Sequence, residues 1–476
     1  MNIVLIFPTQ LFKDIKLIID KEVYLIEEPI YFTNFNYHKL KLAYHRATMK
    51  YYYDYLKKNK VNVKYFEFKS ITNKFYQNIQ TNKIYIYDPI EHELLNKLIK
   101  IYNNKLFIFP TLNFLVYSDI QLLKDNIFNK NYSFNKFYIY YRKKFEILLK
   151  TNGTPIGDKW SFDEDNRKKI PKGTIIENIP KNIYNKYTKE ATDYINYNFS
   201  NNYGDINFIY PITHKESEKW FYNFLKNKIN NFGEYEDATL EKHPFLFHSV
   251  LTPMMNVGLL TDTLIIKKVL SIICIDSKIK IQNIEGFIRQ IFWRNYMMAI
   301  YIIEKPIIKI KNNNSKVYYK LWNGETGIYP IDSMIKKYII PYAYSHHITR
   351  LMYFGNFFKL CLLKDDLIYR WFMEVYIDAY NWVMFGNIYG MVLNKIKIMT
   401  KNYIASSNYI FKMSDFKNID NWKEIFDALY YNFIHINLKN LESDYGLRYQ
   451  LSYWKKKTNK ESIIQIANEY IKKIKK

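Results

Sequence analysis

Residues 2–7 read NIVLIF, and this short run of branched and aromatic residues opens a pattern that recurs along the first quarter of the chain. Similar runs follow at 23–26 (VYLI), 61–66 (VNVKYF), 84–87 (IYIY) and 106–109 (LFIF). Short segments rich in Val, Ile, Tyr and Phe are typical of buried β-strands. We therefore predict five strands in this part of the chain.

The segments between these runs have a different character. Residues 38–58 read HKLKLAYHRATMKYYYDYLKK, a long stretch without Gly or Pro that predicts a helix. Strands that alternate with helices indicate a parallel sheet with covering helices. The sequence therefore predicts an α/β domain over residues 1–130.

The pattern changes twice beyond this domain. A polar stretch with several Gly and Pro residues predicts an interdomain linker over residues 131–210. From 211 to 476 the apolar residues recur with the 3.6-residue spacing of helices, separated by short polar turns. We predict an α/β N-terminal domain with a parallel sheet, followed by a large all-helical domain.

The chain is strongly basic. Its 476 residues include 70 Lys and Arg against 45 Asp and Glu, which gives a formal net charge of +25. Such an excess typically draws a protein to a polyanion, either nucleic acid or an acidic membrane surface. The plainer interpretation is a solubilising excess of lysine. We favour a polyanionic partner.

Several common protein classes lack support in the sequence. Cys274 and Cys361 are too few for a disulfide framework or a four-thiolate metal cluster. We find no secretory signal and no long apolar stretch that predicts a membrane span. The motifs of zinc hydrolases, P-loop proteins, dinucleotide-binding domains and serine hydrolases are also absent. We expect an intracellular, cytoplasmic protein that does not span a membrane.

Two motifs in the predicted helical domain suit a phosphate-bearing aromatic ligand. Residues 243–260 read HPFLFHSVLTPMMNVGLL, which is either a phosphate-binding turn or an ordinary helix start. Residues 285–296 read EGFIRQIFWRNY, in which Arg289, Trp293 and Tyr296 share one helix face. Such a face suits an aromatic ring with nearby phosphates, or a half-buried helix with extended arginine side chains.

Two further segments carry titratable groups among apolar residues. In YSHHITR (344–350), His346 and His347 point about 100° apart on a helix, so only one of them can face a given pocket. A histidine beside a cofactor could donate a proton, whereas elsewhere it would be an ordinary core residue. Asp378 lies in a strongly aromatic segment and needs a partner if it is buried, for which Arg350 is the candidate.

Taken in chain order, these segments resemble the photolyase and cryptochrome superfamily, in particular its prokaryotic photolyase-related branch. That branch includes the iron–sulfur (6-4) photolyases and shorter relatives without the cluster. The resemblance runs over nearly the whole chain. The matching segments are FPTQLF (7–12), HKLKLAYHRATM (38–49), GDKWSFDEDNRKKIP (157–171), FGEYEDA (232–238), LFHSVLTPMMNVGLL (246–260), RQIFWRNY (289–296), ETGIYPID (325–332), HHITRLM (346–352), EVYIDAYNWV (374–383) and NYIASSNYIFKMSDF (402–416).

The resemblance implies that the helical domain binds FAD in a folded conformation. It places the FAD phosphates at Tyr235, Ser249, Leu251 and Thr252, and it lines the flavin and damaged-base pocket with Arg289, Gln290, Trp293 and Arg294. It also implies an Arg350–Asp378 ion pair beside the isoalloxazine ring, and it puts Met384 near flavin N5.

The resemblance also implies residues for the reaction itself. His347, or less readily His346, falls where (6-4) photolyases carry a histidine that assists proton transfer to the lesion. Tyr403 and Tyr409 match positions near the lesion, and Trp371 and Trp322 match tryptophans that pass electrons to the flavin.

The chain departs from the family pattern at several positions. Phe372 stands where some relatives have an electron-transferring Tyr, and Met384 stands where relatives carry a polar residue. Thr9 replaces an acidic residue of the usual Gly-Asp-Gln-Leu, which weakens the expectation of a lumazine-type antenna chromophore. We expect no iron–sulfur cluster, because the four cysteine positions are occupied by Pro330, Lys417, Asp420 and Glu424.

The resemblance implies a deoxyribodipyrimidine photolyase, a carbon–carbon lyase that acts as a monomer on UV-damaged DNA. The (6-4) photoproduct is favoured over the cyclobutane dimer because of His347. Such an enzyme flips the lesion out of the duplex, and contacts from the basic chain to phosphates offset the cost. The alternatives are a cryptochrome-like blue-light photoreceptor without repair activity, and a flavin-free nucleic-acid-binding protein.

Overall fold

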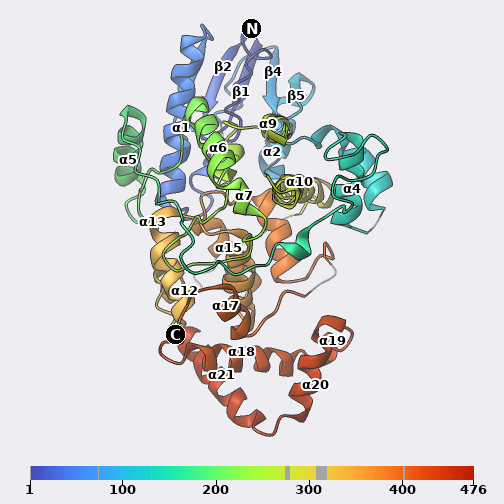
Figure 1. Ribbon diagram of the computed structural model, residues 1–476. Helices are drawn as coiled ribbons and strands as arrows, with labels where there is room; N and C mark the ends of the chain where they lie inside the picture. The colour runs from blue at the N-terminus through green and yellow to red at the C-terminus, as the bar shows by residue number, and fades with distance from the viewer. Residues whose placement is uncertain are drawn as a thin grey trace.

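The structure is a computed structural model that describes residues 2–72, 74–129, 131–273, 279–306, 319–399 and 402–475 (Figure 1). Cys274 lies outside the described residues. A five-stranded parallel sheet with the order β3-β2-β1-β4-β5 forms the N-terminal part. Its strands are β1 (Asn2–Ile6), β2 (Glu22–Ile26), β3 (Val63–Phe66), β4 (Lys83–Tyr87) and β5 (Leu106–Phe109). The predicted strands and their parallel sheet are confirmed.

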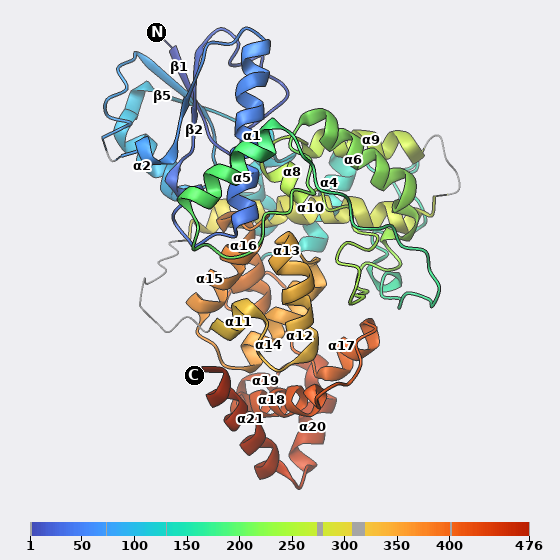
Figure 2. The same ribbon diagram turned by 90° about the vertical axis from the view of Figure 1, so that its left-hand side faces the viewer.

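The strand order reverses direction at β1, which makes the sheet doubly wound. Right-handed crossovers in opposite directions place α1 (Lys39–Lys58) and α2 (His92–Tyr102) on opposite faces of the sheet (Figure 2). The central strands β1, β2 and β4 are mostly buried, as expected of a sheet covered on both faces. The edge strand β5 has no buried residue, so the expectation of a buried strand at 106–109 is wrong, because an edge strand has a neighbour on one side only. The carboxyl ends of β1 and β4 meet at the switch point, where they face the helical half.

The predicted linker contains two helices. The first, α4 (Phe134–Lys144), packs against α10 (Ile281–Glu304), and the second, α5 (Lys186–Asn198), packs against α1. Side-chain caps explain where both helices begin, because Ser133 accepts a hydrogen bond from Lys136 N and Asn185 accepts bonds from Tyr187 N and Thr188 N. The limits 1–130, 131–210 and 211–476 remain predictions about domain organisation.

The remainder of the described chain is mostly helical, as predicted. The 24-residue helix α10 lies at its centre and is buried over most of its length. The other helices are α6 (His214–Asn227), α7 (Ile229–Phe232), α8 (Thr252–Asn256), α9 (Asp262–Ile273), α11 (Tyr319–Asn323), α12 (Tyr329–Met334), α13 (Ile340–Tyr342), α14 (Asn356–Leu360), α15 (Asp365–Val375), α16 (Asn381–Met384), α17 (Ser407–Met413), α18 (Trp422–Ile436), α19 (Leu438–Leu441), α20 (Arg448–Lys456) and α21 (Lys460–Lys475).

Three π-helical segments interrupt this half in the described residues: η7 (Ile335–Ile339), η8 (Thr349–Gly355) and η9 (Phe385–Val392). Segments of this kind are uncommon and often mark functional positions. Within the described residues, no helix combines the length and the apolar character that crossing a bilayer requires.

Helix α1 connects the sheet to the helical half. The main-chain amide of His38 donates to Glu374 O at 2.7 Å, and its imidazole Nε2 lies 3.0 Å from Ile339 O. The ring packs so closely on Gly204, which has a φ of +84°, that a Cβ there would lie 1.9 Å from Nε2. Only glycine fits this position, on grounds of both space and backbone conformation.

A buried arginine holds α5 on α1. The guanidinium of Arg46 lies 2.8 Å from Glu27 and from Glu67, and 2.6 Å from Glu190, while it covers the ring of Tyr194. The Arg46 side chain is 3% exposed and that of Glu27 is fully buried. These carboxylates raise the pKa of Arg46. A buried charge is strongly destabilising unless it is paired with an opposite charge.

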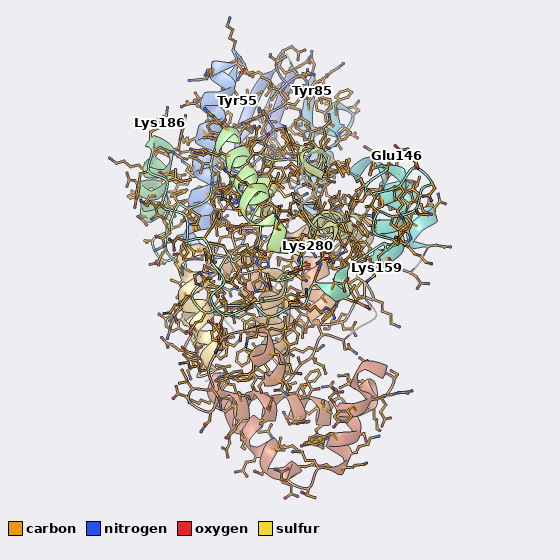
Figure 3. The ribbon with its side chains drawn as sticks, in the orientation of Figure 1. Tyr55, Tyr85, Glu146, Lys159, Lys186 and Lys280 are labelled. Carbon is orange, nitrogen blue, oxygen red and sulfur yellow. The ribbon has the colours of Figure 1, made fainter. Side chains whose placement is uncertain are left out.

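We expect the substitution Arg46→Met to lower the free energy of unfolding by about 3 kcal/mol, because Glu27 would stay buried without its cation. Urea unfolding at neutral pH measures the change. Lys186→Met is the control: Lys186 projects into solvent (Figure 3) and pairs with Asp54 at the surface, so its loss should leave stability unchanged. Equal stabilities for the two variants would contradict this account.

Candidate functional site

Arg350 and Asp378 form an ion pair in the helical half. Arg350 Nη1 lies 2.8 Å from Asp378 Oδ1, and Nη2 lies 3.2 Å from Oδ2. Arg350 Nε also donates to Ser345 O at 2.7 Å, and the guanidinium covers the ring of Tyr376 at 4.0 Å. The geometry is bidentate, which fixes the plane of the guanidinium. The predicted pairing of these two residues is confirmed.

Asp378 also binds the segment predicted to hold phosphates. Thr252 Oγ1, at the start of α8, donates to Asp378 Oδ2 at 2.6 Å. Asn256, at the end of the same helix, donates to the main-chain oxygen of Asp378 at 3.2 Å. The structure therefore brings Thr252 together with the Arg350–Asp378 pair.

The turn before α8 has the backbone of an anion-binding site. Val250 adopts a φ of +51°, which is strained for a β-branched residue, and Leu251 follows in the right-handed helical region. Such a pair of conformations turns successive amides toward one point. In the described part of the chain, the amides of residues 249–251 donate to no protein acceptor. The carbonyl of Ser249 is bound by Trp220 Nε1 at 2.9 Å.

Tyr235 lies on the loop before this turn, where its half-buried ring is 5.7 Å from the ring of Phe247. This contact belongs to a small apolar cluster separate from the main core. The structure places Tyr235 and Ser249 on neighbouring loops. Among the described residues, neither of them forms a hydrogen bond with Arg350.

The two adjacent histidines have different environments. The ring of His346 stacks on His248 at 4.5 Å, and its Nε2 lies 3.0 Å from Thr239 Oγ1. His347 instead lines a small cavity together with Arg350. Burial, and then the charge of Arg350, lower the pKa of His347 to about 4. Of the two histidines, His347 therefore faces the ion pair, and it is neutral at neutral pH.

Met384 and Phe372 line the same cavity, and both are almost fully buried. Asn387 is also at this cavity, three residues after Met384 in η9. Its Oδ1 is buried without a hydrogen-bond partner in the described structure. Our sequence analysis missed this residue. Its signal was present, since Asn387 is the one amide in the apolar run FGNIYGMV.

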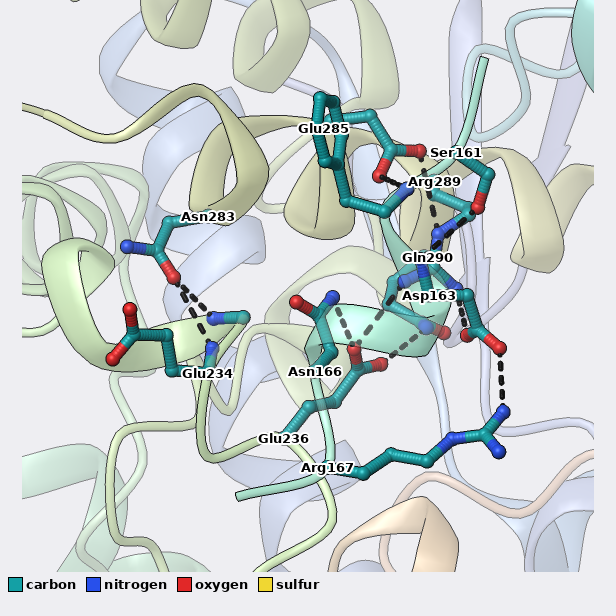
Figure 4. Close-up of polar contacts among 12 residues, drawn as sticks. Ser161, Asp163, Asn166, Arg167, Glu234, Glu236, Asn283, Glu285, Arg289 and Gln290 are labelled. Carbon is teal, nitrogen blue, oxygen red and sulfur yellow. Dashed lines mark hydrogen bonds and ion pairs between the residues drawn. The ribbon is translucent and has the colours of Figure 1, made fainter. Parts of the chain in front are cut away.

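The predicted residues of α10 point toward two separate sites. Arg289 Nη1 lies 2.9 Å from Asp163 Oδ1, and Gln290 Nε2 donates to Glu236 (Figure 4). Burial raises the pKa of Glu236 to about 7. Apart from Glu285 of α10 itself, the contacts of Arg289 and Gln290 are thus with carboxyl groups of two loops, 161–167 and 234–237, whose acidic residues had no role in our sequence analysis.

Trp293 and Arg294 lie elsewhere on α10. The ring of Trp293 packs against Phe134 at 4.8 Å. Arg294 donates to Asn113 O at 2.6 Å and pairs with Asp262 at 3.1 Å. Arg294 also donates to Asn256, which in turn binds Asp378, so it reaches the central ion pair through one intermediate residue.

Tyr403 and Tyr409 lie near the acidic loops. The hydroxyl of Tyr409 interacts with the carboxyl group of Asp237, whose pKa burial raises to about 6. Burial, and then the charge of Asp163, raise the pKa of Tyr403 to about 12. The structure therefore brings the two predicted lesion tyrosines together with Asp163 and Asp237.

The predicted electron-transfer tryptophans lie where α11 meets α15. Trp371 is buried, and its Nε1 donates to Leu321 O at 3.0 Å. Leu321 is the residue that precedes Trp322 in the chain. The ring of Trp371 is 5.8 Å from that of Tyr376, which contacts Arg350. An unbroken series of aromatic contacts thus leads from Trp371 to the ion pair.

A buried lysine is another residue that our sequence analysis missed. Lys41, on α1, donates to the main-chain oxygen of Ala379. Its ammonium also lies over the rings of Tyr37 at 4.2 Å and Tyr380 at 4.8 Å. Burial lowers the pKa of Lys41 to about 7. The alternation of apolar and basic residues in HKLKLAY gave no means of telling which lysine is buried.

A cavity of about 980 Å³ lies beyond the carboxyl ends of β2 and β4, where Asn34, Asp88 and Glu91 are among its lining residues. The space beside Thr9, between Tyr31, Tyr380 and Trp382, is about 10 Å³. A space of that size holds at most about one water molecule. The antenna chromophore therefore stays a prediction of the sequence analysis.

Comparisons with known proteins find relatives over much of the chain. A family model described as deoxyribodipyrimidine photo-lyase-related protein matches residues 4–210. The chain is 34% identical over 342 residues to a (6-4) photolyase of Agrobacterium fabrum, which covers 68% of this chain and 67% of the relative.

Two solved structures share the fold. A bacterial class III photolyase from Agrobacterium tumefaciens aligns with a TM-score of 0.58 at 14% identity, over 100% of this chain and 97% of the other. A cryptochrome from Synechocystis aligns with a TM-score of 0.57 at 12% identity, over 99% of each chain.

We expect NMR titration of histidine-labelled protein to give His347 a pKa near 4, well below the ordinary value of 6.5. The folded protein holds the His347 proton less tightly than the unfolded chain does. The resulting contribution to stability is therefore fully present above pH 6.5 and is lost as the pH falls toward 4. It amounts to about 3 kcal/mol at most. His347→Asn should therefore lose less stability than the parent between pH 7 and 4. A measured pKa of 6.5 or above would contradict the burial described here.

Proposed function

Because the chain belongs to the photolyase and cryptochrome superfamily, we propose that it binds FAD in its helical half and uses light to repair UV-damaged DNA. We further propose that the (6-4) photoproduct is its preferred lesion. The observation that carries the proposal is the buried, bidentate Arg350–Asp378 pair, which borders the cavity that contains His347.

The residues present suit both parts of FAD, its phosphates and its isoalloxazine ring. The turn over residues 249–251 offers unpaired amides to the phosphates, and Thr252 offers a hydroxyl group. Arg350 offers a fixed cation to the polar edge of the isoalloxazine ring, and Asn387 offers a buried oxygen that lacks a donor. An unpaired buried acceptor is costly, so a hydrogen bond from a ring N–H would stabilise the complex.

When bound and reduced, FAD would supply a light-driven electron to the lesion, and the protein would orient the reactants and move protons. Asp378 holds the Arg350 guanidinium in one plane. His347 is the group placed to give a proton to the lesion. It is neutral in the free protein, so it must first gain that proton. The negative charge of a bound DNA phosphate would favour this step by raising its pKa.

The opposite side of the proposed lesion site carries aromatic and acidic groups. Tyr403 and Tyr409 would contact the flipped nucleotide, since aromatic rings stack on bases. The hydroxyl of Tyr409 interacts with Asp237, which orients the ring. The basic charge of the chain would supply phosphate contacts that offset the cost of flipping.

The electron route proposed for reducing the flavin runs through Trp322 and Trp371. Tyr376 would complete it, since its ring lies between Trp371 and Arg350. Phe372 also contacts Trp371, but a phenyl ring has no proton to lose on oxidation.

We expect Asp378→Asn to weaken FAD binding at least about tenfold, because Arg350 would lose its charged partner in the interior and 1.4 kcal/mol corresponds to a factor of ten. Flavin absorbance after titration of the refolded apoprotein measures the affinity. Asp366→Asn, at the half-buried start of α15 and outside the cavity, should bind FAD as the parent does. Unchanged affinity in Asp378→Asn would remove the basis of the proposed flavin site.

We expect His347→Ala to keep its flavin and to lose light-dependent (6-4) repair by a factor of about 100 or more, as is typical when a general acid is removed. Repair of damaged oligonucleotides under blue light is measured for each dimer type. His243→Ala provides the control, since His243 is half-buried and outside the cavity. Full (6-4) repair by His347→Ala would show that this histidine has another role.

The apolar lining at Met384 and Phe372 favours one other function, a cryptochrome-like photoreceptor without repair activity. A thioether and a phenyl ring handle no protons, so the flavin chemistry would differ from that of a repair enzyme. Illumination with damaged oligonucleotide separates the two, because a receptor would photoreduce without restoring bases. If the purified protein is colourless and does not bind added FAD, a flavin-free nucleic-acid-binding protein is favoured instead.

A further inference from the structure

A groove of about 840 Å³ lies between α17 and the C-terminal helices α18 and α20. This part of the molecule lies far from the sheet (Figure 2). Five tyrosines line the groove, and a tyrosine combines a flat apolar face with a polar tip. They are Tyr409, Tyr430, Tyr431, Tyr449 and Tyr453. We refer to it as the tyrosine groove.

Two of these tyrosines expose much of their side chains. Tyr449 is 78% exposed and Tyr453 is 46% exposed, and they lie one turn apart on α20. The packing of α20 depends instead on Trp454, which is 1% exposed and stacks on Tyr431 at 5.6 Å. Tyr453 approaches the other side of this cluster, with its ring 5.8 Å from that of Tyr431. Tyr449 and Tyr453 therefore present ring surface to solvent.

The charge beside the groove is mainly positive. Helix α20 ends in the run Lys455, Lys456 and Lys457, and Lys460 follows shortly after. Lys457 Nζ lies 3.1 Å from the Tyr453 hydroxyl. Of the nearby acids, Glu442 pairs with Lys455. Asp444, which lines the groove, accepts hydrogen bonds from Asn402 and from Gly446 N, and Asp427 lies near Tyr430 and Tyr431. The groove thus combines exposed aromatic faces with lysines, which suits a chain of bases and phosphates.

One residue, Tyr409, belongs to both the groove and the proposed lesion site. Tyr409 lines the groove, and its hydroxyl interacts with Asp237 beside the loops described above. A strand that leaves the lesion site past Tyr409 would therefore enter the groove directly. Its nucleotides would be unpaired there, because flipping a base opens the duplex locally.

We propose that the tyrosine groove binds single-stranded DNA, with bases stacked on Tyr449 and Tyr453 and phosphates held by Lys456 and Lys457. The proposal rests on the proposed function for its biological setting, but the binding itself needs neither flavin nor light. Aromatic platforms beside lysines are the general means by which proteins hold unpaired nucleotides without sequence preference.

Fluorescence anisotropy with labelled oligothymidylate, measured in the dark on the full chain, tests the proposal. We expect Tyr449→Ala and Tyr453→Ala each to weaken binding by about fivefold or more, as is usual for a lost base-stacking contact. Tyr449→Phe and Tyr453→Phe should bind as the parent does, since they retain the ring. Tyr184→Ala and Tyr197→Ala are matched controls, because these tyrosines are 87% and 84% exposed but lie near α5.

An abasic strand of the same length separates stacking from charge. The parent should bind oligothymidylate more tightly than the abasic strand, and Tyr449→Ala with Tyr453→Ala should abolish that difference. Lys456→Ala should weaken binding to both strands and reduce the salt dependence. Thermal unfolding of each variant verifies that the fold is intact.

Two results would overturn the proposal: unchanged oligothymidylate affinity in the double alanine variant, or no preference of the parent for bases over the abasic strand. Tight binding of a proline-rich peptide to the groove, without DNA binding, would also overturn it and indicate a protein partner. Failure of the proposed function is distinguishable, because loss of FAD binding or repair with normal, tyrosine-dependent oligothymidylate binding refutes the photolyase assignment alone.

Discussion

The carboxylate of Asp378 is the constraint on which the arrangement of the helical half depends. It accepts hydrogen bonds from Arg350 and Thr252, while main-chain oxygens of the same loop accept from Asn256 and Lys41. A buried carboxylate is costly unless such donors surround it. The donors come from α1, α8 and η8, so satisfying this one loop fixes the sheet domain against the helices. The position of the proposed cofactor pocket follows from that requirement.

The sequence predicted the parts of this structure that local physics determines. The five strands follow from short β-branched and aromatic runs, and their parallel order follows from the helical segments between them. The Arg350–Asp378 pair was predictable for a related reason: an acid in an aromatic segment needs a cation, and the chain offers few arginines near it. The choice of His347 over His346 required the structure, because a pattern can say only that one of two adjacent side chains faces a pocket.

The remaining parts of the site depend on contacts between distant segments. Arg289 resembles a pocket residue in its own helix, yet it pairs with Asp163, which lies 126 residues earlier on a loop whose path no periodicity predicts. Asn387 owes its position to the π-helical η9, whose altered turn changes which side chains face the cavity. Lys41 is one of several lysines along α1, and only the packing of Tyr37 and Tyr380 singles it out.

Burial disfavours the charged forms of several groups at the proposed lesion site, although the chain as a whole is strongly basic. Burial keeps His347 uncharged and raises the pKa values of Glu236 and Asp237 to about 7 and 6. A phosphodiester that approaches these groups would raise all three pKa values, so DNA binding would be coupled to proton uptake. On the proposed function, the substrate itself would therefore convert His347 into an acid. Proton transfer to the lesion would then be available only when damaged DNA is in place.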